Sequence, residues 1–157
     1  MFPRSFTLAA VQTSIDGLPI EGWGPTDAIG FSFLSEQIKH VVSGDGRVSF
    51  YGTGDLRCRA TLTVMQTNEG AGRLGRILDT ILRDFGMTPG SQPSIQPGGV
   101  MVPRPFRIFD PATGSEWSDS HFVIEKIPDY TIGVEPGPIS FACILPRPLV
   151  KIGALIT

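Results

Sequence analysis

Residues 40–55, HVVSGDGRVSFYGTGD, carry four glycines in sixteen positions and are the first candidate for chemistry, a phosphate-binding loop. Such a loop needs glycines at fixed offsets before a helix, because backbone N–H groups must converge on the anion. Counted from the first pair of glycines, the third position of a dinucleotide fingerprint is Ser49, and counted from the second pair it is Arg57. No Gly-Lys-Ser or Gly-Lys-Thr follows. The pattern therefore favours a hairpin that turns at Gly44-Asp45-Gly46, where glycine accepts a positive φ.

Residues that could bind a metal or act as nucleophiles are few and scattered. His40 and His121 have no acidic or thiol neighbours at ligand spacing, and Cys58 and Cys143 form no Cys-x-x-Cys motif. No Gly-x-Ser-x-Gly elbow is present. The sequence predicts no metal site, no cofactor and no catalytic residue. Both cysteines lie in strand-like runs, so we expect buried thiols rather than a disulfide.

Carboxylates and tryptophans offer two weaker candidates. Asp110, Glu116 and Asp119 could supply an acid-base pair, but acids at a hairpin tip are usually solvated, and such a pair needs burial to tune its pKa values. Trp23 and Trp117 lie in glycine- or serine-bearing segments and could stack on a sugar. Packing at a subunit contact is the more common use of such aromatic residues.

The composition narrows the class of protein. The 157 residues fit one domain, 1–157, and the formal net charge of -2 lacks the basic footprint of a duplex DNA-binding protein. No apolar run approaches the length of a membrane span, and the N-terminal MFPRSF has no signal-peptide core. We expect a protein without membrane insertion that stays in the cytoplasm until it assembles.

Short β-rich segments separated by 19 glycines and 14 prolines predict a sheet protein. The clearest strand lies in residues 56–67, LRCRATLTVMQT, where apolar and polar residues alternate up to Val64. This period of two predicts one buried face and one wet face. The wet face carries Arg57, Arg59, Thr61 and Thr63. Other strands are predicted at 6–15, 28–34, 38–42, 47–51, 106–110, 121–127, 130–134 and 139–145.

One amphipathic helix is predicted within residues 68–86, NEGAGRLGRILDTILRDFG, because its apolar residues recur at three- and four-residue steps. Asn68 is the expected N-cap and Gly86 the expected C-terminal stop. The charged side is either a solvated face or a docking surface, and it carries Arg73, Arg76, Asp79, Arg83 and Asp84.

Residues 87–105 contain five prolines and three glycines in nineteen positions, so neither a helix nor a central strand can persist there. A long loop of this kind is uncommon inside a compact domain unless it has a function. It either reaches a neighbouring subunit or runs passively over its own surface.

Four segments follow one another in an informative order. They are IDGLPIEGW, DAIGFSF, KHVVSGDGRVSF and a strand ending in LTVMQT that runs directly into the amphipathic helix. In this order they resemble the tail tube proteins of contractile-tailed bacteriophages, which carry a His-Val-Val motif before a Gly-x-Asp-Gly-type turn and a Leu-x-Leu-x-Gln-Thr strand end before the helix. The resemblance covers residues 8–85, and more loosely 106–152. The Gly70-Ala71-Gly72 opening of the helix and the long 87–105 loop depart from the family pattern.

The resemblance implies a mainly β fold, in which two antiparallel sheets pack into a sandwich-like barrel with one α-helix on the flank. Six copies would form a ring, and stacked rings would form a hollow tube inside a sheath, with baseplate and tail terminator proteins as further partners. DNA and the tape measure protein would pass through the lumen during genome ejection. The chain would then be a structural virion protein of the tail, assembled in the host cytoplasm, and not an enzyme. The alternative is a baseplate or receptor-binding β-sandwich that binds carbohydrate through Trp23 or Trp117.

The resemblance also suggests roles for three sets of residues. The hairpin that would reach a neighbouring subunit includes Val41, Val42, Gly44, Asp45, Gly46, Arg47, Val48 and Phe50. The candidate lumen face is Arg57, Arg59, Thr61 and Thr63. Its two arginines would attract phosphate unless carboxylates such as Asp27, Glu36 or Asp55 offset them. The candidate sheath-facing side of the helix is Arg73, Arg76, Asp79 and Arg83.

Overall fold

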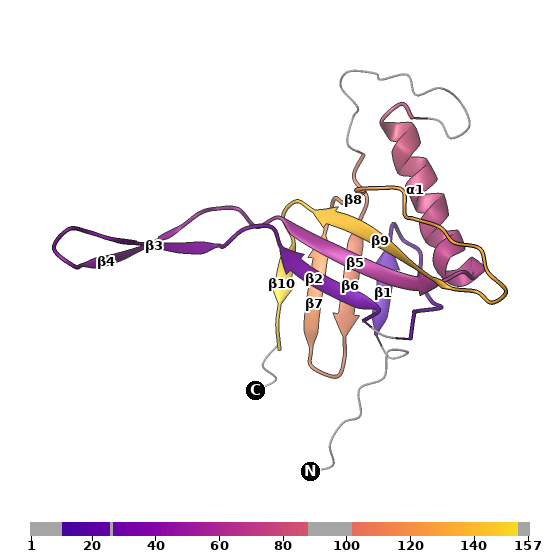
Figure 1. Cartoon of the computed structure of the whole chain (residues 1–157), viewed down its shortest axis with the longest axis horizontal. Helices are drawn as coiled ribbons and strands as arrows, with labels where there is room; N and C mark the ends of the chain where they lie inside the picture. Colours follow the sequence, from indigo (N-terminus) through magenta and orange to yellow (C-terminus); the bar gives the residue numbers. More distant parts are fainter. Residues whose placement is uncertain (1–10, 26, 88–101, 154–157) are drawn as a thin grey trace, which may run out of the picture.

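The computed structural model describes residues 11–25, 27–87 and 102–153. As predicted, these residues form a mainly β structure with one flanking α-helix (Figure 1). Two four-stranded antiparallel sheets pack against each other, and a two-stranded hairpin projects away from them. The described strands form a sandwich, and their sheets do not close into a barrel.

The first sheet has the strand order β1-β6-β7-β10. It consists of β1 (Gln12–Ile15), β6 (Phe106–Asp110), β7 (Ser115–Asp119) and β10 (Leu149–Lys151), all paired antiparallel. The first predicted strand is thus described only from residue 12 onward, because residues 6–10 lie outside the described part of the chain.

The second sheet has the strand order β2-β5-β9-β8. It consists of β2 (Ile29–Phe33), β5 (Cys58–Met65), β9 (Pro138–Leu145) and β8 (Val123–Ile124). Every second residue of β5 is buried, which confirms the alternation predicted from the sequence. The buried set is Cys58, Ala60, Leu62 and Val64.

The core lies between the two sheets, and its largest fully buried side chains are Phe106 and Phe122, whose ring centroids are 5.6 Å apart. Cys58 and Cys143 are buried and free, as predicted. Burial raises the pKa of both thiols, to about 12 for Cys143. They therefore act as small apolar side chains.

The helix begins differently from the prediction. A π-helical turn, Asn68–Gly72 (η2), precedes α1 (Arg73–Asp84). Asn68 is not the N-cap of this segment: Thr67 is, because its Oγ1 accepts a hydrogen bond from the Gly70 amide at 3.2 Å. At the other end, Gly86 adopts φ +74°, so the predicted C-terminal stop is confirmed.

Close packing explains why a glycine, Gly70, stands at the start of the helix. A Cβ added to Gly70 would lie 2.9 Å from the Glu21 carbonyl oxygen and 3.0 Å from the Val64 Cβ. Only a residue without a side chain fits where the helix start passes this close to the preceding strand and loop.

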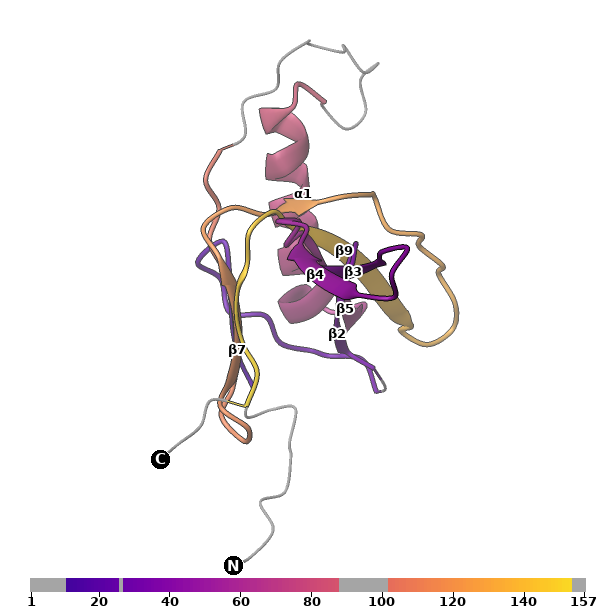
Figure 2. The same ribbon diagram turned by 90° about the vertical axis from the view of Figure 1, so that its left-hand side faces the viewer.

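α1 lies at the end of the sandwich away from the hairpin, and in the view along the hairpin it lies between the two sheets (Figures 1 and 2). Its buried side chains, which join the core as the amphipathic pattern predicts, are Leu74, Ile77, Leu78 and Ile81. The helix therefore closes an open end of the sandwich.

Two predicted strands need correction, and two observed strands were not predicted. The predicted strand 121–127 reduces to the two residues of β8, and the partner that follows β6 is instead β7, which has the polar sequence SEWSD. β7 forms because β6 and β10 pair with its two edges and satisfy its backbone. β10 was missed. The segment 130–134, predicted as a strand, pairs with none of the described strands.

Candidate functional site

The projecting hairpin consists of β3 (Ile38–Val42) and β4 (Val48–Gly52). The Ser43 amide donates to the Arg47 carbonyl oxygen at 2.8 Å, and Gly46 adopts φ +82° between them. The glycine-rich stretch is therefore a hairpin turn, as the glycine offsets predict, and no helix follows it that could hold a phosphate.

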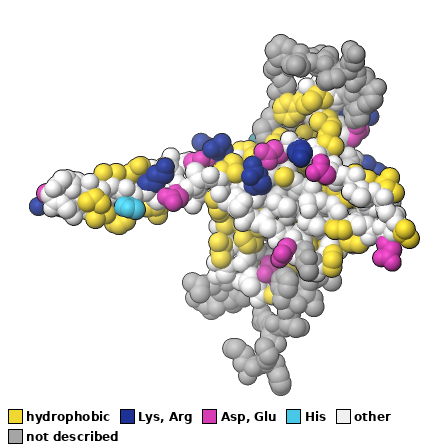
Figure 3. All heavy atoms as spheres, viewed as in Figure 1, with side chains coloured by type: hydrophobic (Ala, Val, Ile, Leu, Met, Phe, Trp, Pro, Cys, Tyr) yellow, Lys and Arg dark blue, Asp and Glu magenta, His cyan; other side chains and the backbone are white. Residues whose placement is uncertain are grey.

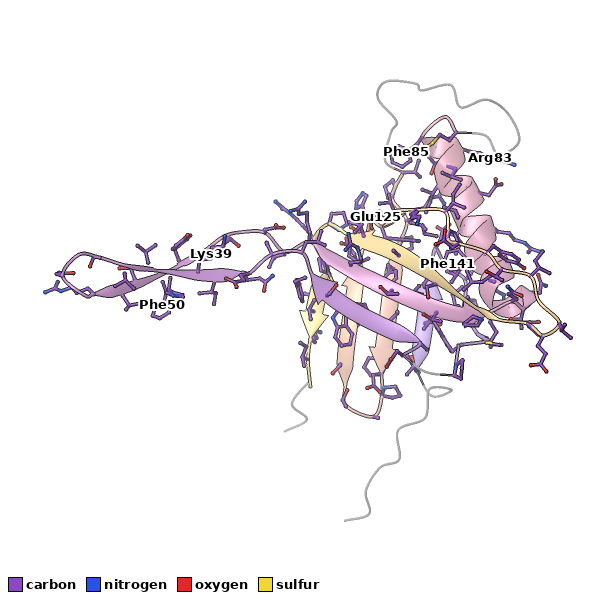
Figure 4. The ribbon with its side chains drawn as sticks, in the orientation of Figure 1. Lys39, Phe50, Arg83, Phe85, Glu125 and Phe141 are labelled. Atoms are coloured by element: carbon purple, nitrogen blue, oxygen red, sulfur yellow. The ribbon has the colours of Figure 1, made fainter. Side chains whose placement is uncertain are left out.

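Every residue of the two hairpin strands is exposed. Because side chains alternate along a strand and paired residues share a face, one face carries Ile38, His40, Val42, Val48 and Phe50. We call this set the apolar hairpin face. The largest apolar residue of this face, Phe50, is 73% exposed. The opposite face carries Lys39, Val41, Ser49 and Tyr51. Figure 4 shows Lys39 and Phe50 on opposite sides of the hairpin.

The apolar hairpin face has no partner among the described residues of its own chain. Figure 3 shows hydrophobic side chains gathered on an arm that extends beyond the body of the molecule, with a histidine side chain beside them. A lone two-stranded hairpin is marginally stable in water, and contiguous exposed apolar surface usually marks an interaction site. The arrangement is therefore suited to binding another protein surface.

The hairpin joins the sandwich through a polar neck, which we define as residues 35–37 and 53–57. The Thr53 amide donates to the Gln37 carbonyl oxygen at 2.9 Å, and the Ser35 hydroxyl donates to Asp55 at 2.7 Å. The Arg57 guanidinium donates to both Asp55 carboxylate oxygens at 2.9 Å. These contacts fix the direction in which the hairpin leaves the body.

The neck should keep its charges in mild acid. Hydrogen bonds from the Arg57 side chain, the Ser35 hydroxyl and the Arg57 amide hold the pKa of Asp55 well below its usual range. The pKa of Asp55 is lower in the folded protein than in the unfolded chain, where it is about 3.9. The ionised Asp55 therefore stabilises the folded protein above about pH 3.9, and this stabilisation is lost only as the pH falls through the folded-state pKa. We expect the carboxyl carbon resonance of Asp55 to stay constant from about pH 7 to about pH 4, with Asp55→Asn as the assignment control. A titration midpoint at the ordinary aspartate value would contradict this.

The wet face of β5 is mostly polar, with Met65 at its end. Arg59, Thr61 and Thr63 are half-buried on the side of the sheet that faces away from the core, and Arg57 lies just before the strand. The Thr63 and Ser140 hydroxyls hydrogen-bond across β5 and β9 at 2.9 Å. The other cross-strand neighbours of these three residues are Gly30, Ser32, Ala142 and Ile144. Most of these side chains are small, and Ile144 is the one large apolar side chain among them.

Both arginines of this face are paired with carboxylates. Asp55 neutralises Arg57, and Glu125 accepts two hydrogen bonds from Arg59, at 3.1 and 3.2 Å. Of the three carboxylates expected from the sequence, Asp27 and Glu36 form no ion pair within the described part of the chain. Sequence reasoning missed Glu125 because it lies 66 residues from its partner and meets it only through the β5-β9-β8 pairing.

The charged side of α1 is partly used within the chain. Arg83 pairs with Asp79 at 3.1 Å, one turn apart, and the Arg73 guanidinium donates to the Pro19 carbonyl oxygen. Arg76 is exposed. The four predicted residues therefore share the helix, but Arg73 points to a neighbouring loop while Arg83 and Asp79 balance each other.

The candidates for sugar binding and acid-base chemistry are engaged elsewhere. The Trp117 ring stacks on Phe31, with centroids 4.2 Å apart and planes within 5°, and Trp23 is half-buried beside Val64. The Glu116 carboxylate pairs with Arg107. Asp110 accepts hydrogen bonds within its turn, and Asp119 accepts them from the amides of residues 121 and 147. The structure does not bring these acids to one site.

A further ionic cluster, missed from the sequence, surrounds Arg104. Its guanidinium contacts Asp16 at 2.8 Å and Asp84 at 2.6 Å, and its side chain is 11% exposed. The cluster joins the turn after β1, the end of α1 and the segment before β6. Residues 88–101 of the predicted 87–105 loop lie outside the described residues. At the loop's described end, the Pro105 carbonyl oxygen also accepts a hydrogen bond from the Asp16 amide at 2.8 Å, so this end is held against the turn after β1.

The described residues contain neither a candidate metal site nor a candidate membrane-spanning helix. The described histidine, cysteine and acidic side chains form no cluster of three or more that could bind a metal ion. Within the same residues, no helix combines the length and hydrophobicity needed to cross a bilayer.

Comparison with known proteins identifies a structural similarity. No family model matches the sequence, and no curated protein matches it. The fold is similar to that of the anti-feeding prophage cap, a tube terminating cap studied by cryo-electron microscopy. The TM-score is 0.52 at 11% sequence identity, and the alignment covers 97% of this chain and 94% of that chain. At this identity the similarity shows a shared fold.

Proposed function

We propose that this chain is a structural subunit of the tube of a contractile tail or a related injection particle. Copies would assemble through the hairpin into hexameric rings, and the rings would stack into a hollow conduit. The protein would function without a cofactor and without enzymatic activity. This extends the sequence resemblance to phage tail tube proteins and agrees with a fold shared with a tube terminating cap.

The observation that carries the proposal is the apolar hairpin face. A soluble monomer gains nothing from an arm whose ten strand residues are all exposed, whereas a ring subunit buries such an arm against its neighbour. Association also covers open strand edges, which are otherwise sites of uncontrolled pairing.

The wet face of β5 is the proposed lumen lining. A conduit for DNA must present polar groups without holding the phosphates, because each unpaired arginine adds a phosphate contact. Asp55 and Glu125 offset Arg57 and Arg59, which leaves a lining with little net charge, composed mostly of small side chains together with Ile144. The passage of DNA and a tape measure protein is therefore compatible with this surface.

The outer side of α1 is the proposed contact with a sheath. Arg76, Asp79 and Arg83 lie on the side of the helix that faces away from the core. Exposed charges of this kind steer association more than they tighten it. Baseplate and terminator proteins would meet the two ends of the stack, and the assembled particle would be the site of function.

A position at the end of the tube is a second candidate, because the similar structure is a terminating cap. A terminator would form single rings, whereas a tube subunit would stack. The receptor-binding alternative loses its best support, since Trp117 stacks within the chain and Trp23 is half-buried.

Negative-stain electron microscopy of the purified, concentrated protein tests these functions. Tubes support the tube subunit, isolated rings support the terminator, and a persistent monomer that binds glycans would overturn both in favour of the receptor-binding module.

A further inference from the structure

Residues 130–134, YTIGV, combine a strand pattern with full exposure. Tyr130, Ile132 and Val134 alternate with smaller residues, and Ile132 is 84% exposed. β8 ends at Ile124, and the last ladder contact is the Glu125 amide donating to the Ala142 carbonyl oxygen. Beyond it the chain leaves the sheet. The sequence of this segment is thus typical of a β-strand, but the segment pairs with no strand among the described residues.

A side-chain contact holds this segment in place. The Gln66 side-chain nitrogen, Nε2, donates to the Thr131 carbonyl oxygen at 2.6 Å. The side-chain oxygen, Oε1, accepts from the backbone amide of Gly137 at 3.3 Å. Its backbone is therefore presented at the surface in a defined position.

The hairpin, in turn, lacks a third strand at its edges. β3 and β4 pair only with each other, so both outer edges of this two-stranded sheet are open. Three or more strands with a hydrophobic face are needed for independent stability. A third strand would have to come from elsewhere.

The two features cannot meet within one chain. The hairpin projects at one end of the molecule, and the loop that contains residues 130–134 lies at the opposite end (Figure 1). A contact between them must join two copies head to tail, which gives a closed ring when the rotation between copies closes and a filament when it does not.

We propose that residues 130–135 of one copy add as a third strand to the β3 edge of the hairpin of the next copy. The occupant of the open hairpin edge is thus a second copy of this chain, bound by β-augmentation. The inference rests on the proposed function, because it specifies how neighbouring subunits of the ring make contact.

The side chains of the two surfaces fit this pairing. In a strand, Tyr130, Ile132 and Val134 share one face, which would extend the apolar hairpin face. Thr131, Gly133 and Glu135 then share the face of Lys39. Lys39 and Glu135 are both exposed, and neither forms an ion pair within the described residues. Opposite charges on adjacent strands stabilise such a pair, which favours β3 over β4 as the augmented edge.

Charge reversal tests the contact. Lys39→Glu and Glu135→Lys should each raise the concentration needed for assembly roughly 2- to 30-fold, because a cross-strand attraction becomes a repulsion. The double variant Lys39→Glu/Glu135→Lys should restore assembly. The matched control is Lys39→Glu/Glu21→Lys, which has the same net charge but places the new lysine outside the contact. Equal assembly of the two double variants would overturn the inference.

Hydrogen exchange on the wild-type protein supplies a second readout. Assembly should slow exchange of the amides of residues 130–134 and of β3 by at least tenfold relative to the monomer. Assemblies in which residues 130–134 exchange as fast as in the monomer would overturn this contact and leave the proposed function standing. A protein that stays monomeric at every concentration would contradict the proposed function itself.

Discussion

Phe50→Asp is expected to abolish self-association while the monomer keeps its fold. Phe50 is 73% exposed at the centre of the apolar hairpin face and contacts the His40 ring rather than the core. Substitutions at such exposed positions usually change monomer stability by less than about 0.5 kcal/mol. In an interface, by contrast, an aspartate in the place of a buried aromatic residue leaves an unpaired charge away from water.

The expected effect on assembly is large. Aromatic residues at the centre of an interface typically contribute about 2–4 kcal/mol when truncated, so even Phe50→Ala should raise the assembly concentration roughly 30- to 1,000-fold. Sedimentation velocity measures the association, and circular dichroism measures the thermal unfolding of the monomer. Ser49→Ala, on the opposite face of the hairpin, is the matched control and should assemble nearly as the wild type does. Normal assembly of Phe50→Asp would show that the hairpin face is not the contact.

Arg104→Ala is expected to lower the free energy of unfolding by about 2–4 kcal/mol. Burial lowers the pKa of the guanidinium, but hydrogen bonds and charge from Asp84 and Asp16 outweigh it, so the pKa lies above its ordinary value. Removing one member of a partly buried ion cluster is costly because it leaves the other charges without compensation. Here two carboxylates would face each other across the gap between the β1 turn and α1.

Arg107→Ala is the matched control, because Arg107 also pairs with a carboxylate but its side chain is 47% exposed. An exposed pair contributes less than about 1 kcal/mol. Arg104→Lys should recover part of the loss, since one ammonium cannot reproduce the guanidinium contacts to both carboxylates. Urea unfolding measures all three variants. Equal stabilities of Arg104→Ala and Arg107→Ala would contradict the structural role assigned to the cluster.

Features set by local pattern were predictable from the sequence. The strict alternation predicted from residue 56 is enough to define β5 and its buried face from Cys58 to Val64, but Leu56, which is 47% exposed, lies before the strand. The Gly44-Asp45-Gly46 turn defines the hairpin. The three- and four-residue spacing of apolar residues defines α1. In each case the residues that determine the element lie within a few positions of one another.

Features that depend on distant partners were not predictable. β7 is poor in β-forming residues and exists because two strands flank it. The helix start follows the approach of Gly70 to the Glu21 carbonyl group. The pairs Arg59–Glu125 and Arg104–Asp16 join residues 66 and 88 positions apart. No spacing rule connects residues this far apart.

The segment 130–134 is a different case, because its sequence favours a strand that the single chain does not form. Local preference and tertiary structure usually agree in natural proteins, and a conflict points to a functional site. The same holds for the hairpin, whose sequence forms strands but leaves their apolar side chains uncovered. Both conflicts would be resolved by one contact between copies.

Native mass spectrometry of the assembled protein tests the central claim, self-association into rings through the hairpin, most directly. The smallest closed assembly of the wild-type chain should contain six copies, and Phe50→Asp should give only the monomer under the same conditions. A wild-type protein that remains monomeric at all concentrations, or a Phe50→Asp variant that forms the same rings, would contradict the account.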